Sequence, residues 1–218
     1  MKISRLSMIL SLAAILCFGI ADVSAQKKVL DRKTYMDATH GPKNSMYEAK
    51  RTVNTVIEEY KDGAAVLTAT RVYQFLAEDN YRFFDNTVSY TGSSRKVERI
   101  RVGHYLYSRE DDGPWKKEDL RLVGGMGSGT GSSTISSSQY TVESVFLGGV
   151  IVDLYEQFIV RSEENGLVFT EDRLWIGHDG ALLQDETVEG TLSPRVETRR
   201  TIRKYDYNPN FKIEAPIP

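Results

Sequence analysis

Turn signals that recur at short intervals between β-rich runs constrain the fold of this chain most. Lys61-Asp62-Gly63, Gly148-Gly149 and Glu164-Asn165-Gly166 each separate two long runs rich in β-branched and aromatic residues. Asp-Gly and Asn-Gly supply the positive φ that a tight hairpin turn requires. Short hairpin links place consecutive strands side by side in opposite directions. The sequence therefore predicts an antiparallel sheet of about nine or ten strands with almost no helix.

The predicted strands are unusually long. Their approximate ranges are 46–60, 64–76, 81–90, 96–102, 105–109, 140–147, 150–161, 167–176, 181–189 and 195–207. The common strand length is about five or six residues, and several of these runs reach about twice that length. Long strands that pair in sequence twist strongly and curl into a barrel or part of one. We predict a mainly β fold, in which a curved antiparallel sheet forms an unclosed half β-barrel with few short helices.

The first 25 residues are typical of a secretory signal. Lys2 and Arg5 precede an apolar run from Leu6 to Ile20, and the run is followed by the small residues at 23–25. This order fits a signal peptide cleaved before Gln26. The apolar run is shorter than the roughly 20 residues that cross a bilayer. We predict export to the periplasm or cell envelope, with secretion as the alternative. Cys17, the single cysteine, would leave with the signal.

The remaining chain is predicted to form one domain after a short leader. Residues 26–45 are expected to be a short helix or linker that ends at His40-Gly41-Pro42, because proline disfavours helix at the residue before it. Residues 46–218 form the domain. Residues 124–138 are rich in glycine and serine, which predicts a mobile loop. Residues 116–123 are expected to form a helical turn or two. The arginine-rich run at 195–207 is predicted to be a solvated or edge strand.

Composition and motifs exclude several classes of function. The formal net charge is -2, without the basic excess expected of a nucleic-acid-binding protein. One cysteine and three scattered histidines predict no metal site and no cofactor. The motifs of serine hydrolases, phosphate loops and zinc proteases are absent from the sequence, so we predict no enzymatic activity. The basic stretches 95–101 and 195–204 are expected to pair with acidic residues across strands, and the alternative is binding to anionic headgroups or an acidic partner.

The order of several motifs resembles a known family. The motifs are the hairpin at 61–63, Asn80-Tyr81-Arg82-Phe83, the segment 100–107 followed by Trp115, the segment 174–182 around Trp175, and the closing Tyr205-Asp206-Tyr207-Asn208. Together with the 212–216 ending they span residues 61–216. In these features the chain resembles the LolA-like superfamily of exported lipoprotein carriers and the related lipid-binding cell-envelope lipoproteins.

This resemblance implies a non-enzymatic binding or carrier protein. Members of the superfamily form a curved, unclosed barrel whose concave face holds acyl chains or other hydrophobic ligands. The expected partner is therefore a hydrophobic small molecule, a lipid or a lipoprotein acyl chain, and not a nucleic acid. The alternative is an envelope protein-interaction or stress-sensing module on the same fold. Eight aromatic residues are the predicted ligand contacts, although any one of them could instead belong to the core: Tyr73, Phe75, Phe83, Tyr107, Phe146, Tyr155, Phe158 and Trp175.

Overall fold

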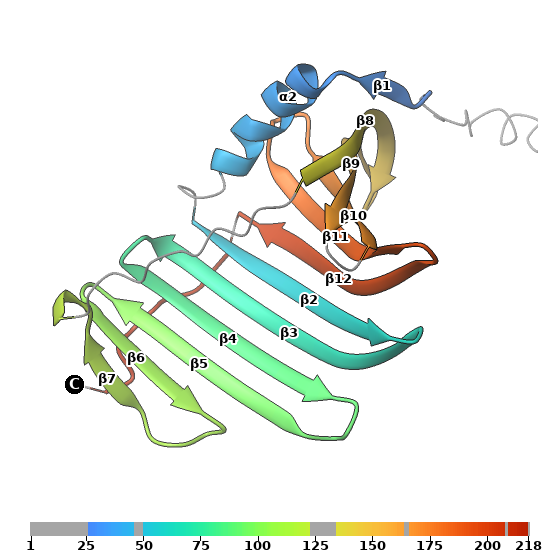
Figure 1. Cartoon of the computed structure of the whole chain (residues 1–218). Helices are drawn as coiled ribbons and strands as arrows, with labels where there is room; N and C mark the ends of the chain where they lie inside the picture. Colours follow the sequence, from blue (N-terminus) through green and yellow to red (C-terminus); the bar gives the residue numbers. More distant parts are fainter. Residues whose placement is uncertain (1–25, 46–49, 123–133, 164–165, 208, 218) are drawn as a thin grey trace, which may run out of the picture.

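The computed structural model describes residues 26–45, 50–122, 134–163, 166–207 and 209–217 (Figure 1). The predicted signal at 1–25 and residues 124–133 of the predicted loop lie outside the described residues. The elements, in chain order, are β1 (Lys28–Leu30), α2 (Arg32–Ser45), β2 (Arg51–Lys61), β3 (Ala64–Ala77), β4 (Asn80–Ser89), β5 (Ser94–Val102), β6 (Tyr105–Glu110), β7 (Lys116–Asp119), the short 3-10 helix η1 (Leu120–Leu122), β8 (Thr134–Leu147), β9 (Val150–Glu163), β10 (Gly166–Ile176), β11 (Leu182–Leu192) and β12 (Arg195–Asp206).

All twelve described strands belong to one antiparallel sheet. Its order is β1-β8-β9-β10-β11-β12-β2-β3-β4-β5-β6-β7. The strands β2 to β7 form one meander and β8 to β12 form another, and β12 joins them by pairing with β2. The two ends of the sheet, β1 and β7, do not pair with each other. The predicted class, a curved and unclosed antiparallel sheet, is confirmed.

The tight turns have the predicted backbone geometry. Asp62 and Gly63, between β2 and β3, have φ values of 53° and 78°. Gly148 and Gly149, between β8 and β9, have φ values of 60° and 90°. Positive φ at both central residues matches the right-handed twist of the flanking strands. These turns set the register of the longest hairpins in the sheet.

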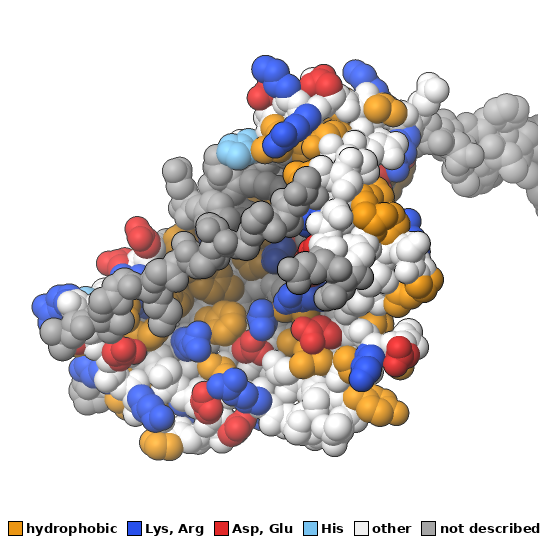
Figure 2. Space-filling model, viewed as in Figure 1, with side chains coloured by type: hydrophobic (Ala, Val, Ile, Leu, Met, Phe, Trp, Pro, Cys, Tyr) orange, Lys and Arg blue, Asp and Glu red, His pale blue; other side chains and the backbone are white. Residues whose placement is uncertain are grey.

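The two faces of the sheet are covered by different parts of the chain. The sheet is hollowed on the face that carries α2, and Figure 2 shows hydrophobic and basic side chains together in this hollow. On this concave face, Tyr35 of α2 packs with Tyr140, Leu174 and Leu182. On the convex face, the C-terminal segment 209–217 packs through Ile213 against β5 and β6. The helix and the tail therefore bury opposite faces at opposite ends of the sheet.

Four parts of the chain differ from the sequence prediction. Strand β8 begins at Thr134, so residues 134–138 are strand rather than loop, because the long strand β9 offers them backbone partners. Helix α2 continues through Pro42 to Ser45; a proline in the last turn removes only one amide donor there. Residues 116–122 form β7 and η1 instead of helical turns alone. Described residues 28–30 are a strand at the edge of the sheet.

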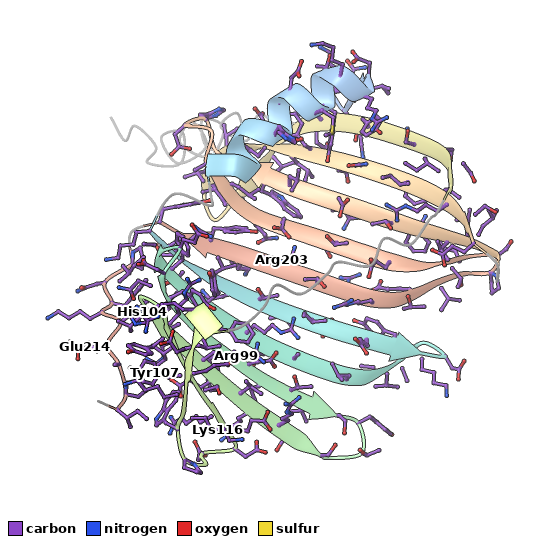
Figure 3. The ribbon with its side chains drawn as sticks, turned by 60° about the vertical axis from the view of Figure 1, so that its left-hand side comes forward. Arg99, His104, Tyr107, Lys116, Arg203 and Glu214 are labelled. Carbon is purple, nitrogen blue, oxygen red and sulfur yellow. The ribbon has the colours of Figure 1, made fainter. Side chains whose placement is uncertain are left out.

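Strand β12 lies in the middle of the sheet, so the prediction of an edge strand was wrong, although most of its side chains are exposed or half-buried as a solvated strand requires. Its arginines are accommodated by carboxylates on the neighbouring strand. Arg203 donates to Asp185 at 2.8 Å, and Arg200 lies 3.4 Å from Glu186 (Figure 3 labels Arg203). Both carboxylate residues are buried. Opposite charges that face each other across strands stabilise the pairing, which is the interpretation preferred for this basic stretch.

Gly190 marks a close approach on the convex face. It lies at a register shift in β11, beside Glu189. A Cβ atom at this position would lie 2.1 Å from the carbonyl oxygen of Val196 and 2.7 Å from a ring carbon of Phe169. The backbone oxygen cannot move without disturbing the β11–β12 pairing. Only glycine fits at this position.

We predict that Gly190→Ala lowers the free energy of unfolding by about 2–3 kcal/mol, because the added methyl overpacks the strand. Urea unfolding measures this difference. Gly41→Ala is the matched control, since a Cβ atom at Gly41 meets open space and alanine favours helix. Equal stability of the Gly190→Ala variant and the wild type would contradict the close approach.

Glu98 of β5 is a buried carboxylate held by two arginines. It accepts hydrogen bonds from Arg109 at 2.7 Å and from Arg82 at 2.8 Å, and its exposed fraction is 5%. Burial opposes ionisation of Glu98, but the hydrogen bonds and charges of Arg109 and Arg82 outweigh it and hold the pKa below its ordinary value. A lowered pKa stabilises the fold above the ordinary value, and this stabilisation is lost as the pH falls through the lowered one.

We predict that Glu98→Gln destabilises the protein by about 2 kcal/mol at neutral pH, because each arginine loses a charged acceptor. The difference from the wild type should shrink as the pH falls below the ordinary carboxyl value of about 4.3 toward the lowered pKa of Glu98, because the wild type loses the stabilisation from its ionised carboxylate over this range. Urea unfolding between pH 3 and pH 7 tests this. Glu118→Gln, which removes a carboxylate with no ion pair among the described residues, should show no such change with pH. A constant difference for Glu98→Gln would disprove the account.

Candidate ligand-binding site

The register of the strands brings a set of aromatic side chains together on the concave face. Residues that pair directly in neighbouring strands project to the same face. Val53 of β2 pairs with Tyr73 of β3, and Tyr73 pairs with Phe83 of β4. In the next row, Phe75 of β3 pairs with Tyr81 of β4. We name these five residues, Val53, Tyr73, Phe75, Tyr81 and Phe83, the aromatic floor.

The aromatic floor is packed but not sealed. The ring centroid of Tyr73 lies 5.5 Å from that of Tyr81 and 6.1 Å from that of Phe75. Phe75 is buried, whereas Tyr73, Tyr81 and Phe83 are half-buried. Burial raises the pKa of the Tyr73 hydroxyl. The floor is therefore partly open to solvent at Tyr73, Tyr81 and Phe83, whereas the Arg51 guanidinium lies over the ring of Phe75 at 4.3 Å.

Helix α2 covers one end of the concave face. Asp31 caps its first turn by accepting a hydrogen bond from the Thr34 amide at 2.9 Å. Four residues later, Tyr35 points into the sheet and is 1% exposed. The Tyr35 ring lies 4.9 Å from that of Tyr140 and 6.3 Å from that of Tyr155. The cap and these ring contacts fix the position of the helix over β8 and β9.

A cavity of about 360 Å³ lies between α2 and the strands β8 and β9. Most of its apolar lining comes from the helix and from the two strands. The lining residues are Arg32, Tyr35, Met36, Thr39, His40, Ile135, Ser138, Tyr140, Gln157 and Ile159. The Tyr35 hydroxyl is buried and has no hydrogen-bond partner in the described structure. Burial, followed by the negative charge of Asp172, raises the pKa of this hydroxyl, which stays a neutral donor.

A second cavity, of about 400 Å³, involves the convex side of β8 to β11 and is polar. Arg173 lies 3.1 Å from Glu186, and Arg195 lies 3.0 Å from Glu171. These charges neutralise one another within the protein. Such a lining fits a structural ion-pair network better than a site for an apolar ligand.

Five of the eight predicted contact residues project to the concave side, and four of them lie in the body of the sheet. Tyr73, Phe75 and Phe83 belong to the aromatic floor, and Tyr155 lies beneath α2. The structure thus brings together three residues from two adjacent strands and places the fourth at the covered end. Their contact with a ligand stays a prediction.

The other four residues lie elsewhere. Tyr107 is buried in the convex core with Ile213. Phe158 and Trp175 also project to the convex side, where Phe158 stacks on Phe169 at 5.8 Å. Phe146 lies at the end of β8 and is 64% exposed. These four side chains are not gathered with the aromatic floor.

Sequence reasoning did not select Tyr35, Tyr81, Tyr140 or Tyr205 as candidate contacts. Tyr35 was placed on one side of a predicted helix, but its partner in the sheet was unknown. Tyr81 is two residues from Phe83 on the same strand, so the two-residue period of a strand was a usable signal for it. Tyr140 and Tyr205 become neighbours of Tyr35 only through pairing between distant strands.

Within the residues that the structure describes, no group of three or more histidine, cysteine, aspartate or glutamate side chains is placed to hold a metal ion. In this same part of the chain, no helix has both the length and the apolar character needed to cross a membrane.

No family model and no curated protein matches the sequence. Among solved structures, the chain is similar to LprF from Mycobacterium bovis, with 10% identity, a TM-score of 0.46, and coverage of 84% of this chain and 97% of that one. It is also similar to LolA superfamily protein NE2245 from Nitrosomonas europaea, with 9% identity, a TM-score of 0.27, and coverage of 81% and 92%. Both TM-scores are below 0.5, so the backbone of this chain overlaps with each of the two solved structures only in part.

We predict that Tyr35→Phe raises the free energy of unfolding of the ligand-free protein by about 1 kcal/mol, because it removes a buried hydroxyl that has no partner. Tyr35→Ala should instead lower it by about 3–5 kcal/mol, since the ring fills the core. Urea unfolding measures both changes. A loss of stability in the phenylalanine variant would mean that the hydroxyl is satisfied in the ligand-free protein, contrary to the structure.

Proposed function

We propose that this chain is an exported, non-enzymatic carrier that binds a lipid or another hydrophobic ligand on the concave face of its half-barrel. The ligand lies along the aromatic floor and reaches into the cavity beneath α2. Lipoprotein acyl chains fall within this ligand class. The signal-like residues 1–25 support export to the periplasm or cell envelope.

The half-buried state of the aromatic floor is the observation that carries the proposal. A core residue is ordinarily sealed, whereas neighbouring apolar side chains left partly open on a hollowed face are typical of a ligand-binding groove. Tyr73, Tyr81 and Phe83 share this state on two neighbouring strands, on the hollowed face. The unpartnered Tyr35 hydroxyl adds a donor that a polar atom of the ligand would satisfy.

Phe83 and Phe84 offer a matched test, because they are adjacent in β4 and project to opposite faces. Purified, delipidated protein is titrated with a fluorescent polyene fatty acid. Phe83→Ser should weaken binding about tenfold or more, since the loss of a phenylalanine contact costs about 1.5–3 kcal/mol. Phe84→Ser should bind as the wild type does.

Two results would contradict the proposal. One is the absence of saturable binding by the wild type. The other is equal weakening by both variants at equal unfolding midpoints, which would place the ligand outside the concave face.

An envelope protein-interaction module is the second candidate, and the hairpin that joins β8 to β9 favours it. Phe146 is 64% exposed, Val150 is 55% exposed and Ile151 is 38% exposed at this tip. Neighbouring exposed apolar side chains suit contact with another protein. Site-specific crosslinking from position 146 to one defined envelope protein, together with a failure to bind fatty acid, would favour this candidate over the carrier.

A further inference from the structure

The row of the sheet that crosses the aromatic floor ends in two basic side chains. Phe83 of β4 pairs with Arg99 of β5, Arg99 pairs with Ser108 of β6, and Ser108 pairs with Lys116 of β7. Directly paired residues share a face, so the concave face changes within one row from aromatic to cationic. Figure 3 labels Arg99 and Lys116 at the β5–β7 end of the sheet.

These residues line a cavity of about 230 Å³. The β6–β7 turn forms its wall through Gly113 and Pro114. Neighbouring strands lie about 4.8 Å apart, so the backbones at Arg99 and Lys116 are separated by about 10 Å with Ser108 between them. Both long side chains can therefore reach one anion placed above the Ser108 hydroxyl.

The charges around the cavity leave a positive excess. Arg109 is occupied by Glu98 at 2.7 Å on the convex side, and Glu110 is neutralised by Arg95 at 2.6 Å. Across the next strand, Asp85 is paired with Arg71. Glu118 lies in the adjacent row of β7. Among the described residues, Arg99 and Lys116 have no ion-pair partner, so both cations are available to a ligand.

An arginine and a lysine on either side of a hydroxyl group are typical of phosphate recognition. The adjoining aromatic floor is suited to hydrocarbon. A molecule that satisfies both parts of the row carries a phosphate at one end and an acyl chain at the other.

We propose that Arg99, Ser108 and Lys116 bind the phosphate of an anionic lipid whose acyl chain lies on the aromatic floor. This assignment rests on the carrier function proposed above and adds a choice of headgroup to it. It also gives the basic stretch 95–101 a role that cross-strand ion pairing leaves open, since Arg99 has no ion-pair partner among the described residues.

The test compares two fluorescent lipids with identical acyl chains, phosphatidic acid and diacylglycerol, of which only the first carries a phosphate. The wild type should bind phosphatidic acid at least about tenfold more tightly, and added salt should reduce this preference. The double variant Arg99→Gln/Lys116→Gln should bind both lipids equally, with unchanged affinity for diacylglycerol. The control Lys28→Gln/Lys61→Gln removes the same charge from exposed positions outside the cavity and should keep the preference.

The outcomes separate the two proposals. Equal binding of both lipids by the wild type would overturn the phosphate site and leave the carrier function standing. Failure of the wild type to bind either lipid would overturn the carrier function, and the headgroup assignment with it. Glycerol 3-phosphate or inorganic phosphate that binds as tightly as the phosphatidic acid probe would show a site for free phosphate, contrary to the proposal. Loss of the preference in the control variant would also overturn it.

Discussion

The pairing of β12 with β2 is the constraint on which the rest of the structure depends. It joins two meanders that are each built from local hairpins. Because this pairing sets Tyr205 opposite Val53, it connects the core beneath α2 with the aromatic floor in one continuous face. The pairing places an arginine-rich strand at the centre of the sheet. Carboxylates such as Asp185, which accepts from Arg203, make that position tolerable.

When a long strand buries residues on both faces, its sequence does not show which face packs the core and which face is available to a ligand. In this chain the convex face is completed by the C-terminal tail and by ion pairs, and the concave face is only partly covered by α2. Because successive residues of a strand point to opposite faces, the convex face and the candidate ligand-binding face are formed by alternate residues of the same strands. The proposed phosphate site lies at the basic end of the concave face, next to the aromatic floor that is proposed to hold the acyl chain.

The sequence predicted the local parts of the fold well, because turn residues determine hairpins. Asp62-Gly63 and Gly148-Gly149 identify their turns directly. The position of β12 could not be predicted, since its partner β2 lies more than a hundred residues away in the chain. The facing of Tyr107 and Trp175 also required the register, because apolar residues occur on both sides of their strands. For the candidate site, the sequence alone shows the motif around Phe83. The row through Arg99, Ser108 and Lys116 forms only when β5, β6 and β7 pair, so it could not be predicted from the sequence.

The central claim, that a hydrophobic chain lies on the concave face, is tested most directly by isotope-filtered nuclear Overhauser spectra of the protein bound to a carbon-13-labelled fatty acid. The account predicts cross-peaks from the methylene chain to the rings of Tyr73, Tyr81 and Phe83. Cross-peaks confined to rings of the convex face, such as those of Phe84 and Trp175, would contradict it.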